Sequence, residues 1–382
     1  MNRIPSSTRL FRFAEEAPMR LRAGGAIGPV DVAFQTWGIL SQAADNAVLV
    51  FHAMTGSQNA AGTNEPLPHV EDFWTEECRE GWWSDFIGPG LAIDTEKYFV
   101  VCANYLGGCY GSTGPCSPDP VTGKPYGSRF PDIRVPDLVD AQMALVDHLG
   151  IDRLHAVVGA SVGGMMAVSL ATRYPKRVRI VVPIGSGMEI SPLQRILNLE
   201  QALAIEMDPH FSGGDYYDSR HPEKGLALAR MIAHKTFVSL SALLERARGE
   251  VLHQGNDLSW YRLNHTLESY MLHQGGKFVR RFDANSYLRI LDAWQNLDLL
   301  GDAGASDYTD LFSRCQDQRM LIFTIDSDVS FYPEEQERLS MALKSAGVRH
   351  LRITVHSDKG HDSFLLEPEL FHPHIAHALD TW

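Results

Sequence analysis

A short turn bounded by glycines constrains this chain more than any other segment. The residues Gly159-Ala160-Ser161-Val162-Gly163 follow an apolar run at 154–158 and precede a helix-like run that ends at Arg173. A strand, a Gly-x-Ser-x-Gly turn and a helix in this order present the serine as a nucleophile. The turn is tight, so side chains at Gly159 and Gly163 would collide with neighbouring backbone, and the strain pushes the Ser161 hydroxyl into the open.

Apolar strand-like runs alternate with helix-like segments over much of the chain. Continuous β-branched runs indicate strands that are covered on both faces, hence a mostly parallel sheet, and their alternation with helices indicates the α/β class. Together with the serine turn, this pattern predicts an α/β-hydrolase fold. The expected strands are 30–37, 47–51, 98–103, 154–158, 179–184, 320–325 and 351–355, and the expected core helices are 135–149, 165–173 and 333–346.

The pattern changes between residues 188 and 313. Strand-like runs vanish there, and helical periodicity takes over at 193–207, 225–240, 267–274 and 286–300. An all-helical insertion after the sixth core strand is where α/β-hydrolases carry a lid over the active site. We therefore expect a first part of the core at 1–187, a helical lid at 188–313 and a second part of the core at 314–382.

Composition excludes several classes of function. A net charge of −13 argues against nucleic acid or an anionic membrane as a partner. The first seven residues lack the pattern of a signal peptide, and no stretch approaches the length of a spanning helix. Five cysteines without Cys-x-x-Cys spacing fit a reducing compartment, so we expect a cytoplasmic protein. The histidines show no metal-ligand spacing, and no metal site is expected.

A nucleophilic serine requires a base and an orienting acid, which follow it in the order acid and then histidine. Asp328 lies just past the strand expected at 320–325 and is the expected acid, whereas Asp326 lies closer to the strand and is expected to brace the turn. His361 follows the next strand, between a glycine and an apolar helix start, and is the expected base. His356 lies at the strand end and is expected to be structural.

These residues predict acyl transfer through a covalent intermediate. His361 takes the proton from Ser161 as the serine attacks an ester or thioester carbonyl, and Asp328 holds the imidazole tautomer. The tetrahedral oxyanion needs two backbone N–H donors. We expect them from Val162, which follows the nucleophile, and from Met54 in the loop after the strand at 47–51.

A series of ordered motifs resembles the homoserine O-acetyltransferase family over nearly the whole chain. The motifs include Gly81-Trp82-Trp83, the runs Leu106 to Pro115 and Gly159 to Met165, Gly213-Gly214-Asp215-Tyr216-Tyr217, and the runs Arg281 to Tyr287 and Gly360 to Leu365. The resemblance implies the triad Ser161, Asp328 and His361, and a homodimer joined through the lid. It also implies a ping-pong reaction in which acetyl-CoA acylates the serine and the homoserine hydroxyl accepts the acetyl group, without a further cofactor.

The sequence departs from the family pattern in the expected lid. Family transferases resemble one another in an arginine of the first lid helix, which receives the acceptor's carboxylate. By this alignment Ala202 occupies the arginine position, and Arg195 lies two helical turns away. The family's histidine near the position of Asn59 is also absent, whereas Asp362, which resembles the family's contact to the acceptor's amino group, is present. A buried carboxylate without a bidentate partner is costly, so an amino-acid acceptor is expected to bind poorly.

The intact triad and the missing arginine favour a serine esterase that hydrolyses acetyl or other short-chain esters through an acyl-enzyme on Ser161. The alternative is homoserine O-acetyltransferase, with acetyl-CoA as co-substrate. A succinyl-CoA preference or a different alcohol acceptor, and a pseudo-enzyme that binds a ligand through the lid, are further alternatives. The expected partners are a small-molecule ester and a second copy of the chain.

Overall fold

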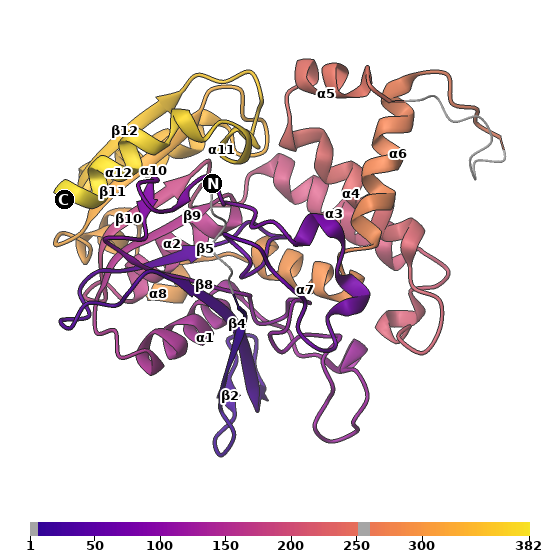
Figure 1. The fold of residues 1–382 in the computed structure, drawn as a ribbon, viewed down its shortest axis with the longest axis horizontal. Helices are drawn as coiled ribbons and strands as arrows, with labels where there is room; N and C mark the ends of the chain where they lie inside the picture. The colour runs from indigo at the N-terminus through magenta and orange to yellow at the C-terminus, as the bar shows by residue number, and fades with distance from the viewer. Residues whose placement is uncertain (1–6, 251–259) are drawn as a thin grey trace.

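The computed structural model describes residues 7–250 and 260–382, and it confirms the α/β-hydrolase fold with a mostly parallel sheet (Figure 1). The sheet order is β1-β4-β8-β5-β9-β10-β11-β12. In this order, the pairs from β8 to β12 are parallel, whereas β4 pairs antiparallel with both of its neighbours, β1 and β8. The bounds are β1 (Arg9–Phe13), β4 (Val30–Trp37), β8 (Phe99–Ala103), β5 (Ala47–Phe51), β9 (Leu154–Ala160), β10 (Val178–Ile184), β11 (Arg319–Ile325) and β12 (Arg349–Val355).

The strands expected from the sequence are present, and β1 is an additional edge strand. Strand β1 is mostly exposed and pairs only with β4, which explains why it lacks a buried apolar run. Two short pairs lie outside the main sheet, and they are β2 (Met19–Arg20) with β3 (Ala26–Ile27) and β6 (Ile87–Gly88) with β7 (Ile93–Asp94).

Helices cover both faces of the sheet. Within β5 the side chains alternate, so that Leu49 joins one apolar cluster and Val50 the other. Helices α1 (Val135–His148), α2 (Val162–Arg173) and α10 (Pro333–Ser345) contribute to the first cluster, and α12 (His372–Thr381) contributes to the second. This layering brings the carboxyl ends of the parallel strands to one edge of the sheet, where the loops after β5, β9, β11 and β12 meet.

The described segments between β10 and β11 contain helices and no strand. Helices α3, α4, α5 and α6 stand beside the sheet in Figure 1. Two of these helices differ from the expected bounds. Helix α6 extends beyond the expected 267–274. The expected helix at 286–300 ends at residue 295, and Asp298 caps a new helix by accepting the Gly301 N–H. The bounds are α3 (Pro192–Glu206), α4 (Glu223–Phe237), α5 (Leu240–Ala247), α6 (Thr266–Val279), α7 (Ala284–Gln295), α8 (Leu299–Ala303) and α9 (Tyr308–Ser313).

The lid boundaries at residues 188 and 313 stay a prediction. Helices α8 and α9 already contact the core helices α2 and α10. The remaining short helices are α11 (Ser363–Leu366) and the 3-10 helices η1 (Glu71–Phe73), η2 (Glu76–Cys78), η3 (Gly127–Arg129), η4 (Ser212–Gly214) and η5 (Pro368–Leu370).

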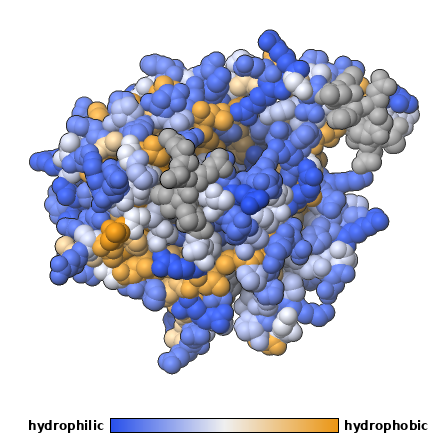
Figure 2. All heavy atoms as spheres, viewed as in Figure 1, coloured by the Kyte–Doolittle hydropathy of each residue, from blue (hydrophilic) through white to orange (hydrophobic). Residues whose placement is uncertain are grey.

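Two sequence-based expectations touch residues beyond the described ones. The absence of a signal peptide was expected from residues 1–7, of which 1–6 lie outside the described residues, as do residues 251–259 of the expected lid. In the described part of the chain, no helix combines the length and the apolar composition that crossing a bilayer requires. On the face drawn in Figure 2, hydrophilic residues predominate, with hydrophobic patches between them.

Candidate active site

Ser161 sits in the strained turn that its glycines predict. It follows β9 and caps α2 with a φ of 58° and a ψ of −129°, a conformation that side chains rarely adopt. A Cβ added at Gly159 would collide with the Gly163 carbonyl oxygen, and one added at Gly163 would collide with the Phe51 carbonyl oxygen. The Ser161 N–H donates to the Ile184 carbonyl at 2.9 Å, which anchors the turn to β10. The predicted nucleophile elbow is therefore present.

The structure brings Asp328 and His361 together as the sequence predicts. Asp328 lies in the loop after β11 and His361 in the loop after β12, and His361 Nδ1 lies 2.6 Å from Asp328 Oδ2. The other carboxylate oxygen of Asp328 accepts the N–H groups of Ser330 and Phe331, both at 2.8 Å. Because both oxygens of Asp328 are engaged, the carboxylate holds the imidazole in one orientation, with the proton on Nδ1.

The electrostatics of this pair favour a base. Burial lowers the pKa of His361, but the charge and hydrogen bond of Asp328 outweigh it, so that the pKa lies above the ordinary value of 6.5. His361 Nε2 is buried and has no hydrogen-bond partner among the residues that the structure describes. With Nδ1 protonated, Nε2 carries the free lone pair, and it lines the same cavity as Ser161.

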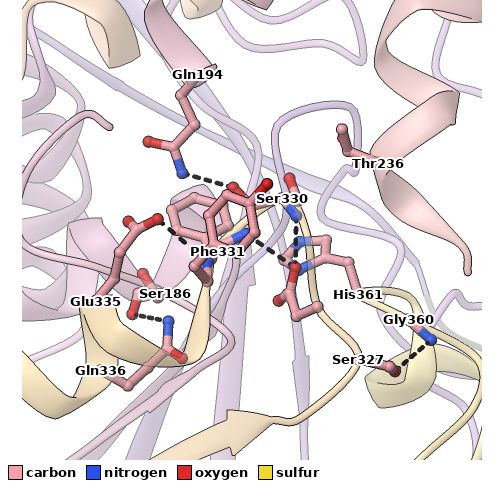
Figure 3. Close-up of polar contacts among 12 residues, drawn as sticks. Ser186, Gln194, Thr236, Ser327, Ser330, Phe331, Glu335, Gln336, Gly360 and His361 are labelled. Carbon is pink, nitrogen blue, oxygen red and sulfur yellow. Dashed lines mark hydrogen bonds and ion pairs between the residues drawn. The ribbon is translucent and has the colours of Figure 1, made fainter. Parts of the chain in front are cut away.

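Asp326 and His356 form a separate pair. Asp326 Oδ2 lies 2.7 Å from His356 Nδ1, and Asp326 Oδ1 accepts the Ser357 N–H at 3.1 Å. The His356 side chain is 83% exposed, in contrast with 3% for His361. This pair braces the two loops near the catalytic pair, and the Gly360 N–H, which donates to Ser327 Oγ at 3.0 Å, adds a further tie (Figure 3). The choice of Asp328 over Asp326 agrees with this geometry.

Both expected oxyanion-hole residues line the cavity. Val162 is the first residue of α2, so its N–H has no acceptor within the helix, and Met54 lies in the loop after β5. That loop is fixed by the Tyr105 hydroxyl, which donates to the His52 carbonyl, and by stacking of the Tyr105 and His52 rings at 3.7 Å. Burial lowers the pKa of His52 to about 4, which keeps this ring neutral.

The cavity above Ser161 has a volume of about 310 Å³. The core supplies the triad side and the lid helices α3 and α4 supply the opposite wall. Apolar side chains form much of the lining, and a few charged groups interrupt it, an arrangement typical of small-molecule sites. The lid side chains that line it include Leu193, Gln194, Leu197, Asn198, Gln201, Arg230, Ala233, Thr236 and Phe237.

Arg230 is a charged residue of the cavity to which the sequence analysis gave no role. It lies on α4, lines the cavity with Ser161, and its guanidinium stacks at 5.0 Å from the ring centroids of Phe237 and of Phe278. Burial lowers the pKa of Arg230 to about 10, and the neighbouring Arg281 adds to this, while the Asp362 carboxylate opposes it. A guanidinium held over aromatic rings in this way can still bind a planar anion through its N–H groups.

Asp362 lines the same cavity. Its backbone N–H donates to the Phe237 carbonyl at 2.8 Å. This hydrogen bond ties the base loop, which follows β12 and carries His361, to the end of α4. Burial raises the pKa of Asp362 above its usual range, against the opposing effects of His361 and Arg230. A cation and a carboxylate therefore lie in one mostly apolar cavity.

Ala202, which the sequence analysis placed at the family's arginine position and expected to meet the substrate, does not line the catalytic cavity. On α3 the residues that face the catalytic cavity are Asn198 and Gln201, whereas Ala202 lines a separate, open hollow with Leu199 and Glu206. The positive charge comes from the next lid helix instead. A useful signal was available in the sequence, since Arg230 shares one face of α4 with Ala233 and Phe237 at helical spacing, an isolated charge on an apolar stripe.

Arg195 does not supply a positive charge to the catalytic cavity. Its Nη1 donates to the Gln295 carbonyl at 3.4 Å in an exposed position, and it is absent from the lining of the cavity. Within the described ranges, no cluster of three or more histidine, cysteine or acidic side chains forms a metal site.

Comparison with known proteins agrees with this architecture. A family model described as the alpha/beta hydrolase fold matches residues 46–368. A homoserine O-acetyltransferase of Mesorhizobium japonicum is 42% identical over 96% of this chain and 91% of its own length. Two solved structures, a homoserine O-acetyltransferase from Bacillus anthracis and a mutant of esterase E22, each superpose with a TM-score of 0.86 at 25% identity, over 98% of this chain. They cover 98% and 100% of their own chains, respectively.

Proposed function

Because this chain belongs to the homoserine O-acetyltransferase family of α/β-hydrolases, we propose that it transfers an acetyl group from acetyl-CoA to the hydroxyl of homoserine. It is an enzyme of the α/β-hydrolase superfamily. The observation that carries the transferase proposal is that Arg230 and Asp362, which carry opposite charges, both line the cavity of Ser161.

The first half-reaction forms the acyl-enzyme. His361 Nε2 accepts the proton of Ser161 as the serine oxygen attacks the thioester carbon, and Asp328 stabilises the imidazolium. The N–H groups of Met54 and Val162 receive the charge that develops on the carbonyl oxygen. The C–S bond breaks, His361 returns its proton to the sulfur, and CoA leaves as the thiol.

The second half-reaction reverses these roles. The homoserine hydroxyl gives its proton to His361 and attacks the acetyl group on Ser161, which releases O-acetylhomoserine and restores the serine. Homoserine carries one carboxylate and one ammonium group. Arg230 binds the carboxylate and Asp362 the ammonium, so the charges of the cavity match those of the acceptor.

Hydrolysis is the second candidate. The acetyl-enzyme would react with water by the same machinery if no alcohol were bound, and the likeness to esterase E22 favours this candidate at the level of fold and sequence. Burial lowers the pKa of Arg230 to about 10, which reflects the cost of holding a charge in this cavity. A small apolar ester offers that charge no partner, whereas the carboxylate of homoserine does. We therefore place the transferase first, which reverses the order of the two functions expected from the sequence.

We also propose a cytoplasmic homodimer. Four exposed apolar side chains follow helical spacing on the face of α3 opposite the cavity, and they are Ile196, Leu199, Leu203 and, at the C-cap, Met207. A stripe of this kind on one helix is suited to burial against a second copy of the lid.

One assay tests the proposed function. Purified protein is mixed with acetyl-CoA, and release of the CoA thiol is followed with and without homoserine, beside hydrolysis of a small acetate ester. The proposal predicts thiol release that depends on homoserine and yields O-acetylhomoserine. Rapid ester hydrolysis together with thiol release that ignores homoserine would falsify it in favour of the esterase.

A further inference from the structure

A second buried carboxylate lies behind the catalytic pair. Glu335 on α10 is 4% exposed, and the catalytic steps above do not use it. Its Oε1 accepts the Tyr332 N–H at 3.2 Å, whereas its Oε2 is buried without a hydrogen-bond partner among the described residues. An unpaired buried carboxylate oxygen is costly, so its retention calls for a reason.

Glu335 and Asp328 both accept backbone N–H groups of the acid loop, which follows β11 and carries Asp328. Three successive N–H groups point at carboxylates, and those of Ser330 and Phe331 bind Asp328 while that of Tyr332 binds Glu335. Phe331, whose N–H is the second of the three, stacks on His361 with ring centroids 5.4 Å apart. In the view of Figure 3, Phe331 lies between Glu335 and His361.

The lid holds the same loop from the other side. Gln194 on α3 donates from Nε2 to the Ser330 carbonyl at 2.7 Å (Figure 3). On the core side, Gln336, next to Glu335, donates to the Ser186 carbonyl in the segment after β10 at 2.9 Å. Space for Glu335 comes from Gly187, where an added Cβ would lie 2.7 Å from Oε2. The carboxylate is thus accommodated at the junction of the acid loop, the lid and the core.

We propose that Glu335 is a positioning residue for the catalytic pair, which holds the acid loop from behind and places a second negative charge near His361. The inference rests on the acyl-enzyme step of the proposed function and is independent of the acceptor. An anion near an imidazole stabilises the imidazolium, so the ionised carboxylate of Glu335 strengthens His361 as a base.

Glu335 is divided between its neutral and its ionised form near neutral pH. Burial raises the pKa of Glu335 to about 7, the Asp328 charge adds to this, and the Tyr332 N–H, Arg338 and Gln194 oppose it. Arg338 lies on the same helix and also pairs with Glu189 at 3.7 Å, and the negative charge of Glu335 contributes to the raised pKa of His361. Glu335 therefore ionises in the pH range in which His361 becomes a base.

The substitution Glu335→Gln tests this inference, because it keeps the shape and the acceptor for the Tyr332 N–H but removes the charge. The readout is the pH dependence of kcat/KM for a chromogenic acetate ester, which reports acyl-enzyme formation alone. The acid limb is expected to move to lower pH by about half a unit, since less negative charge surrounds His361. Glu334→Gln, an exposed neighbour on the same turn, is the matched control and should leave the limb in place.

An acid limb of Glu335→Gln that coincides with the wild-type limb overturns the inference. A second measurement uses the wild-type protein alone and does not depend on how the variant folds. In carbon NMR, the Glu335 δ-carboxyl should be ionised at the pH at which kcat/KM reaches its plateau, and a carboxyl that is still protonated there also overturns the inference. Failure of the proposed acyl-enzyme is separate, because ester hydrolysis would then survive the substitution Ser161→Ala.

Discussion

The Arg230 guanidinium, on lid helix α4, and the Ser161 hydroxyl, at the start of core helix α2, line the same cavity. This relationship joins the two halves of the proposed reaction. In the proposed reaction, the serine serves any acyl transfer, while the arginine selects an acceptor with a carboxylate.

Arg230→Met should separate the two half-reactions. It keeps a long apolar side chain and removes the charged hydrogen bonds, which contribute on the order of 3 kcal/mol, so kcat/KM for homoserine should fall about 100-fold. Acyl-enzyme formation from a chromogenic acetate ester should stay within a few-fold of wild type. Both rates are measured on the same protein preparation.

Two variants serve as controls for this loss. Arg195→Met removes a lid cation that lies outside the cavity, and Ala202→Arg adds one in the separate hollow lined by Leu199 and Glu206. Neither should change kcat/KM for homoserine by more than a few-fold. A large gain in Ala202→Arg would mean that this position, and not Arg230, meets the acceptor.

Ser161→Ala should abolish turnover while the protein stays folded. Loss of the nucleophile costs roughly 10⁴-fold or more in kcat. Alanine keeps the Cβ in the same strained turn, so the midpoint of thermal unfolding should stay within a few degrees. Ser169→Ala on the same helix, at a fully buried position, is the matched control and should stay active. Activity retained in Ser161→Ala shows that another residue is the nucleophile.

The rate of acylation should fall as the pH is lowered through a value above 6.5. Only neutral His361 accepts the serine proton, and its pKa is raised by Asp328 against the effect of burial, so protonation begins at a higher pH than for an ordinary histidine. Burial lowers the pKa of His52 to about 4 and that of His234 to about 3, so neither ring contributes to this limb. Profiles of kcat/KM for wild type and Asp328→Asn check the assignment, since the variant's limb should move to lower pH.

Leu203→Glu should shift the protein from dimer to monomer. The charge falls within the exposed stripe on α3, where Leu203 is 46% exposed, and a buried unpaired carboxylate opposes association. Sedimentation velocity measures the change, with Ile39→Glu as a control at an exposed site on the core. A wild-type monomer at micromolar concentration contradicts the dimer.

The sequence predicted the core better than the lid, for a physical reason. Strands buried on both faces are read directly from apolar runs, and parallel strands bring their following loops to one edge, so the acid and the base could be placed by order alone. Which face of α3 turns inward depends on packing against α4 and α7, and no local pattern decides it. Ala202 and Gln201 are adjacent in sequence yet line different hollows, and that difference reversed the order of the two candidate functions.

The most direct test of the central claim follows the acetyl group on Ser161. The protein is loaded with acetyl-CoA, the acetyl-enzyme is identified by intact mass, and its decay is measured by rapid quench with and without homoserine. The structure predicts that homoserine accelerates the decay and that the acetyl group appears in O-acetylhomoserine. Decay to acetate at the same rate, whether or not homoserine is present, would contradict a role for Arg230 in choosing the acceptor.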